Sequence, residues 1–116
     1  MSLEILSNEE FPSKPHNSPA VKVPGLLFCS GQIGKGEIKA ATVQALSNLK
    51  KVLELGGSSQ SQVVKYNIFL LNMDDFDAMN EAFVAALPSP KPARTCVQAA
   101  KLPGGAIVEI ECIAQV

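Results

Sequence analysis

Apolar residues recur every three or four positions in a stretch that runs from Thr42 to Leu55. The members of this stripe are Val43, Leu46, Leu49, Val52 and Leu53. Such spacing is typical of an amphipathic helix that packs one face against a core. We expect the helix to begin at Thr42, whose hydroxyl suits an N-cap, and to end before Gly56.

A second stripe with the same spacing follows two aspartates, Asp74 and Asp75. Its members are Phe76, Met79, Phe83, Ala86 and Leu87. Acidic residues are favourable at the positive N-terminal end of a helix. The prolines at positions 88, 90 and 92 cannot continue one. The pattern therefore predicts a second helix between these boundaries.

Most other apolar residues lie in short runs that are typical of β-strands. The runs cover residues 20–23, 26–30, 62–71, 93–100 and 107–116, after a polar, proline-rich arm or short strand over residues 1–19. We expect residues 31–39 to form a loop because glycine recurs in them. The predicted order is β-β-β-α-β-α-β-β, an α+β fold with two helices packed on one face of a mixed sheet.

Alternation along the last predicted strand indicates how the sheet is covered. One face carries Val108, Ile110, Cys112 and Ala114, and the other carries Ile107, Glu109, Glu111 and Ile113. The first face suits packing beneath the helices. The second mixes carboxylates with isoleucines, which is unusual for a face open to solvent, so we expect a homo-oligomer to cover it.

Composition narrows the class of protein. A chain of 116 residues, 47% of them hydrophobic, predicts one folded domain over residues 1–116. The net charge of −1 argues against a dedicated nucleic-acid binder. No apolar run approaches the roughly 20 residues of a membrane-spanning helix, and the acidic N-terminus does not resemble a signal or import peptide. We therefore expect a soluble cytoplasmic protein without a membrane partner.

Cysteine and histidine give no support for a metal site. Cys29, Cys96 and Cys112 are odd in number and lie in hydrophobic runs, which is typical of reduced thiols. His16 is the single histidine, and no CxxC pair accompanies it. We expect no bound metal ion.

Charged positions on two predicted strands are candidates for chemistry. Arg94 shares a strand face with Cys96 and Gln98, and a guanidinium is suited to bidentate binding of a carboxylate. A surface ion pair is the alternative for Arg94. Glu109 and Glu111 share another strand face, where one carboxylate could polarise water; alternatively both face solvent or pair with lysines.

Smaller side chains add further candidates. Asn80 lies on the apolar stripe of the second helix, so its amide either ties the structure together or lines a site. Ser30 and Gly31 are expected at the end of a strand, where they either approach a ligand or begin a turn. Cys96 is either a thiol of the site or a buried, inert cysteine.

Four segments carry motifs that are more specific than any single residue. They are Leu27–Ile33 (LFCSGQI), Lys91–Val97 (KPARTCV), Leu102–Ala106 (LPGGA) and Val108–Glu111 (VEIE). Together they resemble the Rid/YjgF family, the reactive-intermediate deaminases, and the resemblance runs from about Ala20 to the C-terminus. It implies a chorismate-mutase-like (YjgF-like) fold and a homotrimer with sites between subunits.

The resemblance also implies an activity. In the family, such sites hydrolyse 2-imino acids and enamines such as 2-aminoacrylate to 2-oxo acids and ammonia, without a metal or organic cofactor. Arg94 would clamp the substrate carboxylate, and Glu109 would position or polarise the attacking water. Backbone groups at Gly31 and Cys96 would hold the imine, and Ser30 and Asn80 would line the cleft.

Two departures from the family pattern lie near the expected cleft. Asn17 occupies the position of an aromatic residue that helps to close the site, and the loop after Ile33 is shorter than usual. These two departures keep open an alternative in which the chain is a catalytically silent trimer that binds small carboxylates or has a regulatory role. An RNA-directed role, also associated with the family, is disfavoured by the net charge and the single tyrosine, because RNA binding relies on basic surfaces and stacking rings.

Overall fold

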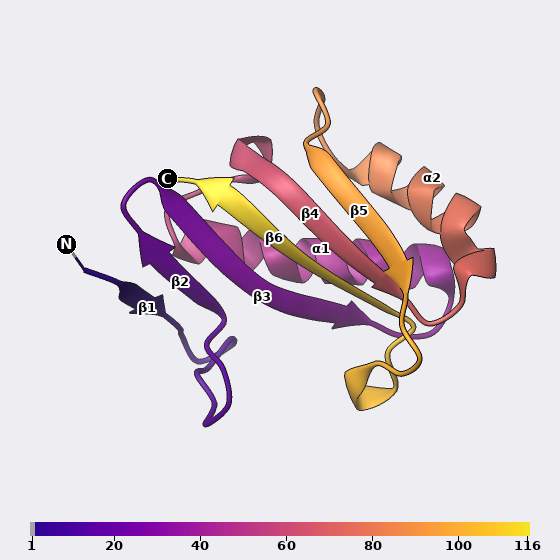
Figure 1. Cartoon of the computed structure of the whole chain (residues 1–116), viewed down its shortest axis with the longest axis horizontal. Helices are drawn as coiled ribbons and strands as arrows, with labels where there is room; N and C mark the ends of the chain where they lie inside the picture. The colour runs from indigo at the N-terminus through magenta and orange to yellow at the C-terminus, as the bar shows by residue number, and fades with distance from the viewer. Residues whose placement is uncertain (1) are drawn as a thin grey trace.

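The computed structural model describes residues 2–116 and contains a six-stranded sheet with two helices packed on one of its faces (Figure 1). The strands are β1 (Glu4–Leu6), β2 (Ala20–Val23), β3 (Leu26–Gly34), β4 (Val63–Leu70), β5 (Ala93–Gln98) and β6 (Val108–Gln115). Their order in the sheet is β1-β2-β3-β6-β4-β5, and all neighbours are antiparallel except β4 and β5. The helices are α1 (Ile38–Leu55) and α2 (Phe76–Ala86), and short 3-10 turns occur at η1 (Gln60–Gln62), η2 (Met73–Asp75) and η3 (Pro103–Gly105). The predicted element order and α+β class are confirmed.

The buried face of the sheet is the one that strand alternation predicts. Its fully buried side chains include Tyr66, Ile68 and Leu70 of β4 and Val108, Ile110 and Cys112 of β6. The alternate residues of both strands are only half-buried on the opposite face. This second face includes Phe28 of β3, which is 43% exposed, so a partly apolar sheet surface is left without a covering layer in the single chain.

Helix α1 begins four residues before the predicted start. Glu37 is its N-cap, and the Glu37 Oε2 accepts a hydrogen bond from the Ala40 N–H at 2.9 Å. Thr42 does not cap the helix as predicted, because it is buried inside and its hydroxyl donates to the Ile38 carbonyl at 2.8 Å. The predicted stripe member Val43 is 50% exposed, because at 100° per residue it lies outside the arc that the buried residues of α1 occupy. That face carries Ile38, Ala41, Thr42, Ala45, Leu46, Leu49, Val52 and Leu53.

Strand β3 continues through residues 31–34, the first part of the segment that was predicted to be a loop, and α1 takes up its last two residues. A β-bulge interrupts its pairing with β6 between Cys29 and Gln32. Ser30 and Gly31 therefore lie at the bulge in the middle of the strand, not at its end as predicted. The partner strand β6 comes more than seventy residues later, so no local pattern could reveal that the glycine-rich segment is paired.

Other boundaries agree with the predictions to within two residues. The N–H of Gly56 donates to the Val52 and Leu53 carbonyls at the end of α1, as expected for a glycine stop. Ahead of α2, the Asn72 side chain accepts from the Asp74 N–H at 2.9 Å, within the η2 turn. No helix in residues 2–116 is both long and apolar enough to span a bilayer.

Replacement of Gly34 by alanine is expected to lower the free energy of unfolding by about 3 kcal/mol. A Cβ at this position would overlap the Ala41 carbonyl oxygen and would lie 2.8 Å from the Ala41 Cα, so the α1 backbone would have to move away from β3. Urea unfolding followed by circular dichroism measures the change.

Gly36→Ala is the matched control for this experiment. Gly36 has a φ of 87°, and a Cβ at this position would have open space around it, so only the left-handed backbone opposes alanine, at about 1 kcal/mol. Equal losses for the two variants would contradict the close approach of Gly34 to α1.

Candidate active site

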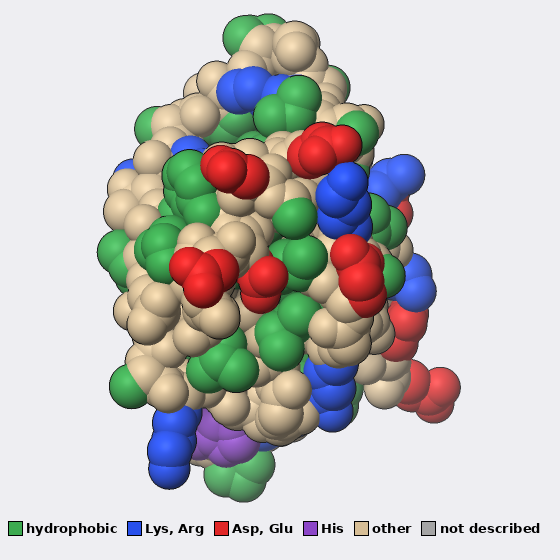
Figure 2. Space-filling model, turned by 90° about the vertical axis from the view of Figure 1, so that its right-hand side faces the viewer, with side chains coloured by type: hydrophobic (Ala, Val, Ile, Leu, Met, Phe, Trp, Pro, Cys, Tyr) green, Lys and Arg blue, Asp and Glu red, His purple; other side chains and the backbone are tan. Residues whose placement is uncertain are grey.

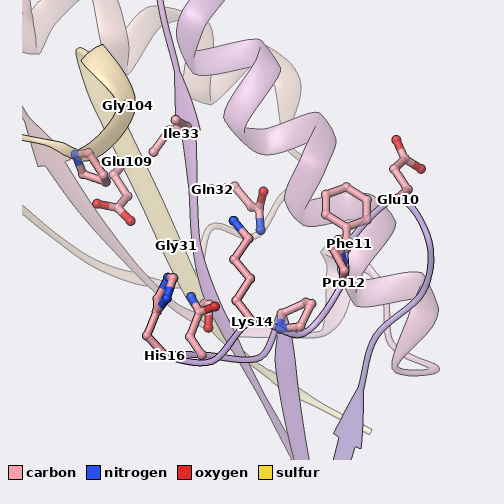
Figure 3. Close-up of a pocket in the computed structure, with 14 residues that line it drawn as sticks. Glu10, Phe11, Pro12, Lys14, His16, Gly31, Gln32, Ile33, Gly104 and Glu109 are labelled. Carbon is pink, nitrogen blue, oxygen red and sulfur yellow. The ribbon is translucent and has the colours of Figure 1, made fainter.

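A cleft of about 510 Å³ opens between the N-terminal arm and the middle of β3 (Figure 3). Residues 30–33 and Glu109 form its floor, and Pro103 and Gly104 of η3 form one wall. The opposite wall is the arm, which contributes Glu10, Phe11, Pro12, Lys14, His16, Asn17 and Pro19. Four residues predicted for the site line this cleft, namely Asn17, Ser30, Gly31 and Glu109.

The Glu109 carboxylate lies directly against Gly31. A Cβ at position 31 would overlap the Glu109 Oε2 and would lie 2.8 Å from the Glu109 Cδ. Glycine is therefore the residue that leaves room for the carboxylate at the floor of the cleft. Burial in the cleft, and to a smaller extent the charge of the nearby Glu111, raises the pKa of the Glu109 carboxyl above its usual range.

The two carboxylates that share a face of β6 have different surroundings. Glu111 accepts a hydrogen bond from the Asn67 Nδ2 at 3.1 Å, across the β4–β6 pairing. Glu109 lines the cleft, whereas Glu111 does not. The structure thus separates a carboxylate tied to a neighbouring strand from one that is available to a ligand, a choice that the strand pattern left open.

The arm is attached to the sheet at the bulge. The Ser30 hydroxyl donates to the Ser18 carbonyl at 2.6 Å, and the Ser30 N–H donates to the Pro19 carbonyl at 2.9 Å. On the arm itself, Lys14 and Asn17 are paired by reciprocal backbone hydrogen bonds that close a turn. Ser30 therefore positions the wall of the cleft, in addition to lining its floor.

A second group of predicted residues lies between β5 and α2. The Arg94 guanidinium carbon is 5.0 Å from the ring centre of Phe83 and 5.8 Å from that of Phe76, which is within the range of cation–π attraction. Asn80 falls between these two phenylalanines on the helix, and its Oδ1 is buried without a hydrogen-bond partner in residues 2–116. Cys96 follows two residues after Arg94 on the same strand.

The surface acids near this group do not neutralise Arg94. Asp and Glu side chains gather on the end of the molecule that carries α2 and β5 (Figure 2). Glu81 of α2 pairs with Lys39 at 3.1 Å, and Arg94 forms no salt bridge with any carboxylate in the described part of the chain. The surface ion pair considered for Arg94 is therefore not formed, and its charge is available to a ligand.

Cys96 is not an activated thiol. Burial raises its pKa, and the opposing effect of the Arg94 charge is smaller. A thiol with a raised pKa holds little thiolate at neutral pH, so it is a poor nucleophile. The raised pKa favours the inert cysteine of the two alternatives for Cys96.

One chain does not bring Arg94 and Glu109 together. Arg94 is opposite Tyr66 of β4, which lies on the helix-covered face, whereas Glu109 is opposite Phe69, three residues farther along β4. Residues an odd number of positions apart on a strand point to opposite faces. The predicted site residues therefore form two groups on two faces of the sheet.

Several residues of the cleft were not predicted from the sequence, in particular Phe11, Lys14, His16 and Gln32. Apart from Asn17, the arm was assigned to no site, because its polar, proline-rich composition is typical of a loop. The isolated aromatic and basic side chains of the arm are the signal that could have indicated these residues. The structure contains no cluster of three metal-ligating side chains in residues 2–116.

Comparison with known proteins agrees with this architecture. A family model described as Endoribonuclease L-PSP matches residues 8–116. The chain is 43% identical over 105 residues to the 2-iminobutanoate/2-iminopropanoate deaminase of Dermatophagoides farinae, covering 83% of this chain and 82% of that protein. It is 47% identical over 110 residues to the mitochondrial protein mmf1 of Schizosaccharomyces pombe, covering 86% and 67% of the two chains.

Solved structures show the same fold. The crystal structure of RidA from an Antarctic Psychrobacter bacterium matches with a TM-score of 0.90 and 38% identity, over 97% of this chain and 99% of that one. The two-helix, six-stranded fold and its arm-covered cleft define a small α+β protein of the YjgF type. The chain belongs to the Rid/YjgF family, as the sequence motifs indicated. Its relatives include that iminobutanoate deaminase and a chloroplastic protein of Arabidopsis thaliana named Reactive Intermediate Deaminase A.

Proposed function

We propose that this protein hydrolyses small 2-imino acids, and the enamines in equilibrium with them, to 2-oxo acids and ammonia. The observation that carries the proposal is the Glu109 carboxylate, which lies at the floor of the cleft against Gly31 and has a raised pKa. The similarity to a protein named 2-iminobutanoate/2-iminopropanoate deaminase supports it.

The reaction requires one residue that exchanges protons with water. Glu109 accepts a proton from a water molecule as the oxygen adds to the imine carbon, and the electron pair of the C=N bond moves to nitrogen. Glu109 passes this proton to nitrogen and then relays the hydroxyl proton as the C=O bond forms and the C–N bond breaks. Both protons of water reach the nitrogen, which leaves as ammonia. A carboxyl whose pKa is raised toward neutrality suits both directions of transfer.

Arg94 would bind the carboxylate of the substrate through its planar guanidinium. Because Arg94 and Glu109 lie on different faces, we place the site between two copies of the chain, in a homotrimer. Strand β5 is at the edge of the sheet, so its Arg94 group can meet the cleft of a neighbour. The half-buried face of β4 and β6 offers the partly apolar surface that such an assembly would bury.

The proposal is tested by mixing the protein with threonine dehydratase and threonine, which together generate 2-iminobutanoate. The measured quantity is the rate at which the imine becomes 2-oxobutanoate and ammonia, with heat-unfolded protein as the control. Light scattering on the same sample reports whether the trimer is present. A folded trimer that does not accelerate the conversion would contradict the proposed reaction for this imine.

Glu111→Gln is expected to move the acid limb of the pH profile of kcat/KM to lower pH. Ionised Glu109 is the active form, so activity falls as the pH drops through its pKa. The negative charge of Glu111 contributes to raising that pKa, and glutamine removes the charge while it keeps an oxygen that can accept from Asn67. A limb that stays in place or moves to higher pH would show that Glu109 does not control it.

A second candidate function is binding of small carboxylates without turnover. It is favoured by Asn17, which lines the cleft wall at the position where the family usually carries an aromatic residue. Calorimetric binding of 2-oxobutanoate combined with no release of ammonia in the dehydratase assay would select this function over hydrolysis.

A further inference from the structure

The turn at residues 14–17 holds two basic side chains over the cleft. The Lys14 N–H donates to the Asn17 carbonyl at 2.8 Å, and the Asn17 N–H donates to the Lys14 carbonyl at 3.3 Å. Together with the attachment of the arm at Ser30, these bonds fix the turn relative to β3. Figure 3 shows the Lys14 and His16 side chains extending from the turn into the cleft, on the side of Gln32 and Glu109.

Lys14 has no carboxylate partner in residues 2–116. Glu10 is the acidic residue of the arm that lines the cleft, and it is already paired with Lys51 at 2.8 Å. Glu109 lies across the floor and forms no salt bridge with Lys14. The arm side of the cleft therefore presents a positive charge that no described acid neutralises.

A ligand that fills the cleft would displace water from this charge. Lys14 is exposed in the single chain, and a ligand seated over it interacts best through an anionic group, since an ammonium ion and a carboxylate form a charge-assisted hydrogen bond. His16 presents an N–H donor in either protonation state of its ring, and the Gln32 amide adds further donors at the floor. The part of the cleft around Lys14, His16 and Gln32 is therefore complementary to a carboxylate.

We propose that Lys14, assisted by His16, selects substrates with a second carboxylate, so that the preferred substrates are imines of 2-oxo dicarboxylic acids. The inference rests on the imine hydrolysis proposed above. There, Arg94 of a neighbouring copy binds the carboxylate next to the imine carbon, which leaves Lys14 for a carboxylate at the other end of the molecule. The cleft volume of about 510 Å³ is in the range of small-molecule sites.

The test compares two imines of four carbons that differ in the terminal carboxylate. Aspartate with an aspartate oxidase generates 2-iminosuccinate, and threonine with threonine dehydratase generates 2-iminobutanoate. The measured quantity is the ratio of kcat/KM for the dicarboxylic imine to that for the monocarboxylic one. We expect a ratio above one for the unmodified protein and a decrease of about 10- to 100-fold in Lys14→Gln, since a charge-assisted hydrogen bond is lost.

Two further variants show whether the charge at this position is the cause. Lys14→Arg keeps the positive charge and should retain most of the selectivity. Lys50→Gln removes a charge from an exposed lysine of α1 outside the cleft and should leave the ratio unchanged. Circular dichroism confirms that each variant is folded.

The possible failures are distinguishable. If both imines are hydrolysed and Lys14→Gln leaves their ratio unchanged, the inference is wrong and the proposed reaction stands. If neither imine is hydrolysed, the proposed reaction fails. The inference is then tested by calorimetry, which measures the affinities of the protein for oxaloacetate and for 2-oxobutanoate. Tighter binding of oxaloacetate that is lost in Lys14→Gln would support dicarboxylate selection, and equal binding of both acids would overturn it.

Discussion

Arg94→Ala is expected to lower kcat/KM for 2-iminobutanoate by about 100-fold or more, while the chain stays folded and assembled. In the structure the guanidinium is held over Phe83 and Phe76 and has no acid partner in residues 2–116. Removal of one partner from a desolvated, hydrogen-bonded charge pair costs about 2–5 kcal/mol, and about 2.8 kcal/mol corresponds to a factor of 100. The dehydratase assay measures the rate, and light scattering measures the assembly.

Two variants isolate the role of the guanidinium. Arg94→Lys keeps the charge but loses the planar fork, so we expect activity between those of the unmodified protein and Arg94→Ala. Lys50→Gln removes a remote positive charge and should leave the rate unchanged. A folded, trimeric Arg94→Ala protein with near-normal hydrolysis would exclude Arg94 as the carboxylate clamp.

Glu109→Gln is expected to lower kcat by about 100-fold or more, because general acid–base groups contribute roughly 10²–10⁴-fold to the rate. Glutamine has nearly the same shape, so it fits against Gly31, but it cannot accept and return a proton. The effect should fall on kcat more than on KM, since the carboxylate of the substrate is bound elsewhere. Measurement of both constants in the dehydratase assay checks this division.

Glu54→Gln is the matched control, because Glu54 is an exposed carboxylate of α1 that lies outside the cleft. It should behave as the unmodified protein does. If Glu109→Gln retained its kcat, the water would have to be activated by another group, and the carboxylate at the floor of the cleft would have only a binding role.

The secondary structure was predictable where the signal is local. The buried face of β6 followed from alternation around Ile110, and helix α2 followed from its apolar spacing and the prolines after it. The start of α1 was missed because Glu37 is an unusual N-cap, while Thr42 has the side chain that the rules favour.

The candidate site was predictable in part. The resemblance predicted that Arg94 and Glu109 belong to one site, and within a single chain the structure places them in two groups on different faces of the sheet. The sequence could not show which residues of the arm lie on the side of Glu109, because Lys14 and His16 belong to a loop without periodicity. The homotrimer, the roles of these residues and the expected cytoplasmic location stay predictions.

The sequence by itself determined the family, the order of helices and strands, and which face of β6 is buried, because short-range spacing and specific motifs carry that information. Only the tertiary structure decided that β3 pairs through its glycines, that Glu109 rests on Gly31, and that the arm lines the cleft. These features depend on contacts between residues far apart in the chain. Local propensities specify each segment, but the packing of the whole sheet determines which segments meet.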